Sequence, residues 1–288
     1  MSGPFGSSQW MYNAGGGFYD YSIDGSLRFN DDDSAYLNRT PSSSSNRGTW
    51  TWSAWLKMGN VSILEGLFGA GNASNNWTNI LFNNDVLVFK AEDGGTVRAN
   101  VETQALFRDP SAWYHIVVIL DVTEGSSSDR VKIYVNGTLQ SLTIITAPSA
   151  TSGHYKINAN IGHSIGARYL ASPTSFFDGY MAEVNFVDGT ALDPTSFGET
   201  KSGVWIPKSY SGSYGTNGFH LEFDGNTNDS SGNGNNWTAN NISAHDYVPD
   251  SPTNNFATLN FLDNTGQTLS EGNLKFYNNA SSHKGARG

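Results

Sequence analysis

Residues 113–121 read Trp-Tyr-His-Ile-Val-Val-Ile-Leu-Asp, and residues 131–137 read Val-Lys-Ile-Tyr-Val-Asn-Gly. The first segment is apolar on both faces, which is typical of a central strand in a sandwich. In the second segment Val131, Ile133 and Val135 alternate with Lys132 and Tyr134, as in a strand with one buried face. The closing Asn-Gly pair predicts a tight hairpin, because both central residues of a type I′ turn need positive φ.

The same pattern extends towards the N-terminus. In residues 49–57 the apolar residues recur with period two, which places four of them on one face of a strand: Trp50, Trp52, Ala54 and Leu56. Residues 86–90 form another apolar run, and the Asn83-Asn84-Asp85 turn precedes it. Strands of this length separated by Asn and Gly turns indicate antiparallel pairing.

A further strand is predicted at residues 180–186, where polar and apolar residues alternate. Its apolar set (Tyr180, Ala182, Val184 and Phe186) is expected to point to the core. Glu183 and Asn185 are expected to point to solvent, so this strand is predicted to be half-exposed. Long amphipathic helical patterns are absent from the sequence, so we predict an all-β fold, an antiparallel sandwich or jelly roll.

The composition excludes several classes of function. Of the 288 residues, 16 are Lys or Arg and 26 are Asp or Glu, and this net charge of −10 would repel a phosphate backbone. Nucleic acid is therefore not an expected partner. No apolar run approaches the ~18 residues of a membrane span, so no membrane insertion is expected. With no cysteine and no visible secretory leader, we expect synthesis in a reducing bacterial cytoplasm, as for a bacterial or viral product.

Composition shifts along the chain suggest three parts. Residues 1–22 are rich in Gly, Ser and aromatic residues without periodicity, and we predict an N-terminal arm for anchoring or for contact with another subunit. Residues 23–200 carry the strand patterns and are predicted to form the sandwich. Residues 201–288 are dominated by Ser, Gly, Asn and Tyr, and we predict a partly ordered extension with added strands, the clearest at residues 219–223.

The order of the strand segments resembles that of laminin-G-like domains, a group with the concanavalin-A-like jelly roll. The segments that carry the resemblance are Ser26-Leu-Arg-Phe, Tyr36-Leu, Trp50-Thr-Trp-Ser-Ala-Trp-Leu-Lys, Trp113-Tyr-His-Ile-Val-Val, Val131-Lys-Ile-Tyr-Val-Asn-Gly, Asn160-Ile-Gly and Phe177-Asp-Gly-Tyr-Met-Ala-Glu-Val. Further on, Phe219-His-Leu-Glu-Phe-Asp, Asp229-Ser-Ser-Gly-Asn-Gly-Asn and Ser251-Pro-Thr-Asn-Asn-Phe resemble virion proteins of tailed, particularly marine, phages.

That resemblance implies a non-catalytic virion protein, such as a tail-fibre or appendage subunit that contacts host-surface glycan or neighbouring virion proteins. It also implies a homo-oligomer, with a trimer favoured, located in the phage particle. One alternative is a head-decoration or tail-assembly protein without receptor binding. A second alternative is a glycan-cleaving hydrolase of the concanavalin-A-like class.

The hydrolase alternative depends on carboxylates. Retaining enzymes of this class carry Glu-x-Asp-x-(x)-Glu on one strand, and their two outer carboxyls stand ~5–5.5 Å apart. Glu222 and Asp224 supply the first half of that pattern, but no third carboxylate follows, and Glu183 is followed by Asn185. A hydrolase would therefore need a second carboxylate near Glu222 from elsewhere in the chain.

Two binding hypotheses concern the same region. His220, Glu222 and Asp224 share one face of a predicted strand, as a metal or sugar site or as a solvated face. The segment that begins at Asp224 offers oxygen ligands of the kind that Ca²⁺ prefers, and Ca²⁺ would be the one cofactor. The predicted calcium ligands are Asp224, Asn226, Asn228 and Asp229. The alternative is an ordinary turn rich in Asn and Asp. Trp77 and Trp237 are either sugar-stacking or buried.

Overall fold

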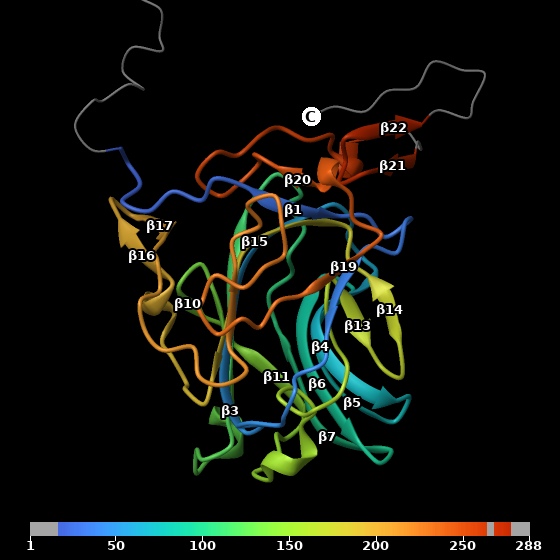
Figure 1. The fold of residues 1–288 in the computed structure, drawn as a ribbon, viewed down its shortest axis with the longest axis vertical. Coiled ribbons are helices and arrows are strands. Elements are labelled where there is room, and N and C mark those ends of the chain that lie inside the picture. The colour runs from blue at the N-terminus through green and yellow to red at the C-terminus, as the bar shows by residue number, and fades with distance from the viewer. Residues whose placement is uncertain (1–16, 264–267, 278–288) are drawn as a thin grey trace, which may run out of the picture.

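The computed structural model describes residues 17–263 and 268–277, so most of the predicted N-terminal arm lies outside the described residues. Strands account for 45% of the structure and helices for 5%, which confirms the all-β prediction. Two large antiparallel sheets pack face to face (Figure 1).

The first sheet contains eight strands in which neighbours are hydrogen-bonded. Its order is β10 (Thr138–Leu139), β9 (Val131–Val135), β8 (Tyr114–Asp121), β3 (Thr49–Met58), β15 (Gly179–Asp188), β1 (Ser26–Phe29) and β20 (Tyr247–Val248), and β18 (Phe219–Leu221) also pairs with β15. All of these pairs are antiparallel.

The second sheet also contains eight strands. Its order is β11 (Leu142–Thr146), β7 (Thr96–Thr103), β6 (Val86–Asp93), β5 (Asn76–Asn83), β4 (Leu64–Ala73), β12 (His163–Ile165), β2 (Tyr36–Arg39) and β19 (Thr238–Asn240).

Smaller elements complete the described chain. Three separate hairpins pair β13 (Ala167–Tyr169) with β14 (Pro173–Phe176), β16 (Gly198–Lys201) with β17 (Val204–Pro207), and β21 (Thr268–Ser270) with β22 (Lys275–Tyr277). The helices are single 3₁₀ turns, namely η1 (Ser127–Asp129), η2 (Ser152–His154), η3 (Pro194–Ser196), η4 (Ala244–Asp246) and η5 (Phe261–Asp263). Among the described residues, no helix is long and apolar enough to cross a membrane.

The core between the sheets is rich in aromatic side chains. Trp50 and Trp52 of β3 are fully buried and pack against Phe89 and Phe68 of the opposite sheet. The predicted period-two face of this strand is confirmed, since Ala54 and Leu56 belong to the same core cluster. The predicted hairpin at Asn136-Gly137 is confirmed as well, because both residues adopt positive φ, 48° and 75°.

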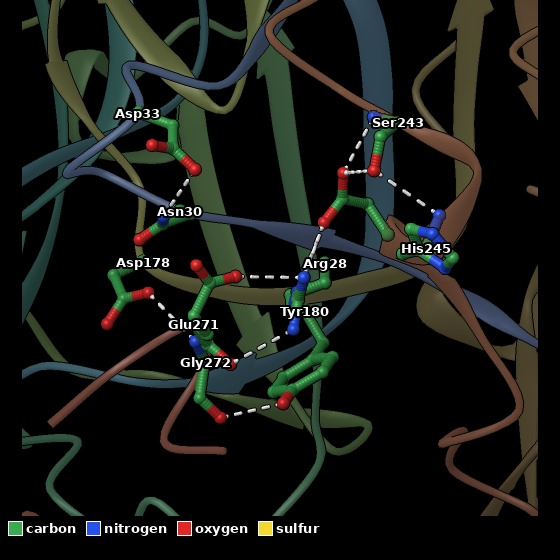
Figure 2. Close-up of polar contacts among 10 residues, drawn as sticks. Arg28, Asn30, Asp33, Asp178, Tyr180, Ser243, His245, Glu271 and Gly272 are labelled. Carbon is green, nitrogen blue, oxygen red and sulfur yellow. Dashed lines mark hydrogen bonds and ion pairs between the residues drawn. The ribbon is translucent and has the colours of Figure 1, made fainter. Parts of the chain in front are cut away.

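Residues beyond position 201 add strands to both sheets, with β18 on β15, β19 on β2 and β20 on β1. Ion pairs and hydrogen bonds connect this segment to the sandwich (Figure 2). The guanidinium of Arg28 forms ion pairs with Asp246 at 2.7 Å and Glu271 at 2.9 Å. The hydroxyl of Tyr180 on β15 donates to the carbonyl of Gly272 at 2.6 Å.

The predicted half-exposed strand at residues 180–186 is wrong in two respects. All ten residues of β15 are buried, because the chain before β1 and the segment after β17 cover its outer face. A β-bulge also shifts the register against β3 between Ala182 and Asn185. As a result Met181 faces the inner core, whereas Tyr180 and Ala182 face the outer cluster with Trp55 and Trp113.

Candidate functional site

One edge of β15 changes its partner at Glu183. Met181 pairs with Leu27 of β1, and Val184 pairs with Leu221 of β18. The segment before β1 and the segment after β18 both approach the edge of β15 at Glu183. They cannot both pair with it there, so they diverge from each other. The divergence opens a cleft of about 570 Å³, bounded by residues 21–25, 222–225, 244 and 247–249, with Glu183 among its lining residues.

The cleft lining is acidic and partly aromatic. Four carboxylates line it (Asp24, Glu183, Glu222 and Asp224), together with three aromatic side chains (Tyr21, Phe223 and Tyr247). Among the residues that the structure describes, no Lys or Arg lines the cleft. Such a surface suits a ligand that donates hydrogen bonds and carries no negative charge.

Glu183 occupies the bulge of β15 in the left-handed backbone region, with φ 50°. Only 7% of the residue is exposed. Its two carboxylate oxygens have different partners: the hydroxyl of Tyr21 donates to Oε1 at 2.7 Å, and the Nε2 atom of His220 lies 2.8 Å from Oε2. Bulges and left-handed non-glycine residues concentrate at functional sites, so this strained carboxylate is a functional candidate.

His220 on β18 is held from two sides. Its backbone N–H donates to Oδ1 of Asp229 at 2.9 Å, and its ring stacks on Tyr214 with centroids 6.1 Å apart and planes 7° apart. Burial lowers the pKa of His220, but the hydrogen bond and charge of Glu183, with Glu222 and Asp229, outweigh burial, so the pKa is raised overall. Burial and the neighbouring Glu183 also raise the pKa of Tyr21.

Glu222 completes a cluster with Glu183 and His220. It directly follows β18 and is exposed, and the hydroxyl of Ser230 donates to its Oε2 at 2.7 Å. One nitrogen or oxygen atom from each of the three residues lies within 4.8 Å of the others. The sequence identified His220 and Glu222 as one polar face but missed Glu183, because the pairing of β18 with β15 has no local signal.

The carboxyl pair of Glu183 and Glu222 bears on the hydrolase alternative. That alternative requires a second carboxylate close to Glu222, and Glu183 provides it within a cleft. One oxygen of each carboxylate lies within 4.8 Å of the other. The geometry therefore keeps catalysis among the functions to be tested.

The predicted calcium ligands lie in the loop after β18. The carboxylate of Asp229 accepts four hydrogen bonds. The backbone of His220 in β18 donates one, and the loop donates three, from the backbone and hydroxyl of Ser231 and from the backbone of Asn235. Asn226 Oδ1 accepts from the backbone of Asn228, which is an Asx turn. Asp224 instead lines the cleft. Calcium binding by this loop stays a prediction.

Trp77 and Trp237 are both buried, with exposed fractions of 2% and 4%. Trp77 lies beneath the guanidinium of Arg168 and the ammonium of Lys90. Trp237 packs on Phe219 in the main core. The buried interpretation of these two side chains is confirmed, and neither offers a free ring face to a sugar.

Comparison with known families agrees with this architecture. A laminin-G family model, described as the concanavalin A-like lectin/glucanases superfamily, matches residues 29–196, more than half of the chain. The chain belongs to this superfamily. The match runs from the last residue of β1 to the last residue of η3, so the matched segment includes Glu183 but neither His220 nor Glu222.

Several solved structures are similar to this superfamily member. A candidate carbohydrate-binding protein from Bacteroides ovatus is 16% identical with a TM-score of 0.49, over 77% of this chain and 60% of that one. A heptameric SAP-like pentraxin from Limulus polyphemus is 15% identical with a TM-score of 0.43, over 59% and 78%. The CBM40 of a Ruminococcus gnavus IT-sialidase, bound to α2,3-sialyllactose, is 11% identical with a TM-score of 0.41, over 61% and 92%. A search among curated proteins found no match.

Proposed function

We propose that this chain is a non-catalytic carbohydrate-binding module and that the cleft beside Glu183 holds the sugar. The observation that carries the proposal is the combination of four carboxylates with Tyr21 and Tyr247 in one cleft of a lectin-type sandwich. Carboxylate oxygens accept hydrogen bonds from sugar hydroxyls, and aromatic rings pack on the apolar faces of sugars.

The charge of the cleft narrows the ligand class. Sialic and uronic acids would meet four carboxylates, and no Lys or Arg in the described part of the chain lines the cleft to attract them. Neutral hexoses and amino sugars avoid this repulsion, and an ammonium group would be attracted. We therefore propose neutral or amino-sugar glycans as the ligands.

The biological setting proposed is a tailed-phage virion, in which the chain serves as a tail-fibre or appendage subunit and assembles as a homotrimer with other virion proteins. The support is the resemblance of residues 219–224, 229–235 and 251–256 to such proteins. A cryo-EM map of the particle tests this setting. Density at the tail with the cleft facing outward supports host recognition, whereas density on the capsid shell with the cleft against other subunits indicates a decoration protein.

A glycan array tests the ligand proposal directly. We expect binding to neutral or amino-sugar glycans and loss of at least 10-fold in affinity for E222Q, measured by calorimetry with the best glycan. The matched control is D129N, which removes one carboxylate in η1, outside the cleft lining. Absence of binding to any array glycan, or equal affinity of wild type and E222Q, would overturn the proposal.

The Glu183–Glu222 pair supports glycan hydrolysis as a second candidate function. Incubation of the bound glycan with the protein, followed by a reducing-end assay, separates the two candidates. Release of reducing ends by wild type but not by E222Q would establish a hydrolase. Stable binding without release supports the non-catalytic module.

A further inference from the structure

Three side chains with metal-binding chemistry converge beside the cleft: Glu183 of β15, His220 of β18 and Glu222 just after β18. We propose that they form a binding site for a divalent transition-metal ion such as Zn²⁺. The proposal goes beyond glycan binding and does not depend on it.

Backbone pairing brings the three residues together. Val184 is opposite Leu221 and Asn185 is opposite His220, so Glu183 and Glu222 follow directly at the end where this pairing stops. His220 and Glu222 are two residues apart and project from the same face of the strand. One nitrogen or oxygen atom from each of the three side chains lies within 4.8 Å of the others, which is close enough for them to share one ion.

The charges of the cluster are poorly compensated without a cation. In the described part of the chain, the recorded ion pairs give Glu183 one partner, His220, and give Glu222 none. Glu183 is nevertheless buried, and two carboxylates at this separation repel each other. A divalent cation would neutralise both.

Each donor is already oriented by an outer partner. Tyr21 donates to Glu183, and Ser230 donates to Glu222, each at 2.7 Å. The stacked ring of Tyr214 and the backbone bond to Asp229 fix His220. Metal ligands in proteins are characteristically held by such outer hydrogen bonds and contacts, which reduce the cost of assembling the site.

The donor set selects the kind of metal. One imidazole nitrogen with two carboxylates suits Zn²⁺ and similar ions, whereas Ca²⁺ prefers oxygen ligands alone. Zn²⁺ binds these atoms at about 2.1 Å, which places tetrahedral ligand atoms about 3.4 Å from one another. The 2.8 Å hydrogen bond between His220 and Glu183 must therefore open slightly as the ion replaces it, and the exposed side chain of Glu222 can rotate towards the ion. Further coordination positions would face the cleft, since both Glu183 and Glu222 line it.

Isothermal titration of the chelator-treated full chain with ZnCl₂, without glycan, tests the site. We expect stoichiometric binding of a single ion, and weakening by 10- to 100-fold or more in E222Q and H220Q, the range seen when metal sites lose a supporting group. The matched controls are D129N and H245Q, which remove a carboxylate and an exposed imidazole outside the cluster and should leave Zn²⁺ affinity unchanged.

Glu222 is exposed, so E222Q decides the outcome even if H220Q fails to fold. The proposal is overturned if no stoichiometric Zn²⁺ binding occurs, if E222Q binds Zn²⁺ like wild type, or if Ca²⁺ displaces Zn²⁺ at equal concentration. The calorimetry with ZnCl₂ alone needs no glycan, so it tests the metal site independently of the proposed sugar binding. Glycan binding is measured separately, once in EDTA and once in Zn²⁺, so a failure of sugar binding is distinguished from a failure of the metal site.

Discussion

The ammonium group of Lys57 in β3 lies 2.9 Å from Oδ2 of Asp250, and both side chains are buried. The same ammonium donates to Oδ1 of Asn255 at 2.8 Å and to the carbonyl of Phe256 at 2.6 Å. Asp250 in turn accepts from the indole N–H of Trp113 at 3.2 Å. Residues 250–256 thus supply these hydrogen bonds and the counter-charge of a buried lysine in a central strand of the first sheet.

Removing Asp250 should therefore destabilise the whole sandwich. We expect D250A to lower the free energy of unfolding by about 3–5 kcal/mol, because it leaves a buried ammonium without its counter-charge. Urea unfolding followed by tryptophan fluorescence measures this change. Adding K57M to D250A removes the unpaired buried ammonium and should restore part of the lost free energy of unfolding. A D250A variant whose stability lies within about 1 kcal/mol of wild type would contradict the prediction.

A second prediction concerns pH and Asp178, which precedes β15. Burial, together with the charge of Asp31, raises the pKa of Asp178 to about 7. The unfolded chain releases this proton near pH 4, so stability is fully present below pH 4 and is lost as pH rises to about 7. The loss is at most about 4 kcal/mol, at 1.4 kcal/mol per pKa unit.

D178N cannot ionise, so it should gain stability relative to wild type as pH rises from 4.5 to 8. Urea unfolding at several pH values measures the difference. Burial also raises the pKa of Glu65 well above its ordinary value, and Glu65 is present in both proteins. Its contribution to the pH dependence of stability therefore has the same sign in each. A difference between D178N and wild type that does not change with pH would show that Asp178 ionises freely in the folded state.

A third prediction concerns His115 in β8, whose contribution to stability should decrease as pH falls, opposite to the pH dependence expected for Asp178. Burial lowers its pKa to about 3, and the ring is held between the Ser53 hydroxyl at 2.9 Å and the indole N–H of Trp205 at 3.0 Å. An unfolded histidine has a pKa near 6.5, so the stability that neutral His115 contributes is present above pH 6.5 and is lost as pH falls towards 3.

The stability advantage of wild type over H115Q should therefore shrink between pH 7 and pH 4. The same unfolding series at both pH values checks this. His163 is buried as well, with a pKa lowered to about 4, and it remains in both proteins, so it cancels from the comparison. An advantage that grows on acidification would contradict the assignment.

A fourth prediction concerns close packing at Gly66 in β4. A Cβ atom at this position would lie 1.7 Å from the backbone nitrogen of Arg168, so the β13–β14 hairpin sits directly on the glycine. We expect G66A to cost about 3 kcal/mol or more. The control is G125A, where an added methyl group meets nothing within 4 Å, and its stability should change by less than about 0.5 kcal/mol.

The strand pattern was predictable because each signal is local. Trp50 and Trp52 alternate with smaller residues, and the two positive φ values at Asn136-Gly137 follow from the residue types. Prediction failed at β15, because a bulge at Glu183 interrupts the period of two on which the argument depended.

The candidate site was predictable only in part. His220 and Glu222 share a face by spacing alone, and the sequence identified both. Glu183 joins them through a register between strands more than thirty residues apart, and Tyr21 reaches it from a segment 162 residues away. Neither relationship leaves a trace in local hydropathy, so only the folded chain reveals the cluster.

The contacts of Lys57 with residues 250–256 have a consequence for folding during translation. A nascent chain that has left the ribosome only as far as β17 contains most strands of both sheets, but it lacks the counter-charge of Lys57 and the strand β18 that pairs with β15. Such an intermediate exposes the outer surface of its first sheet to other chains. The native packing around Lys57 is therefore complete only once residues 250–256 have emerged from the ribosome.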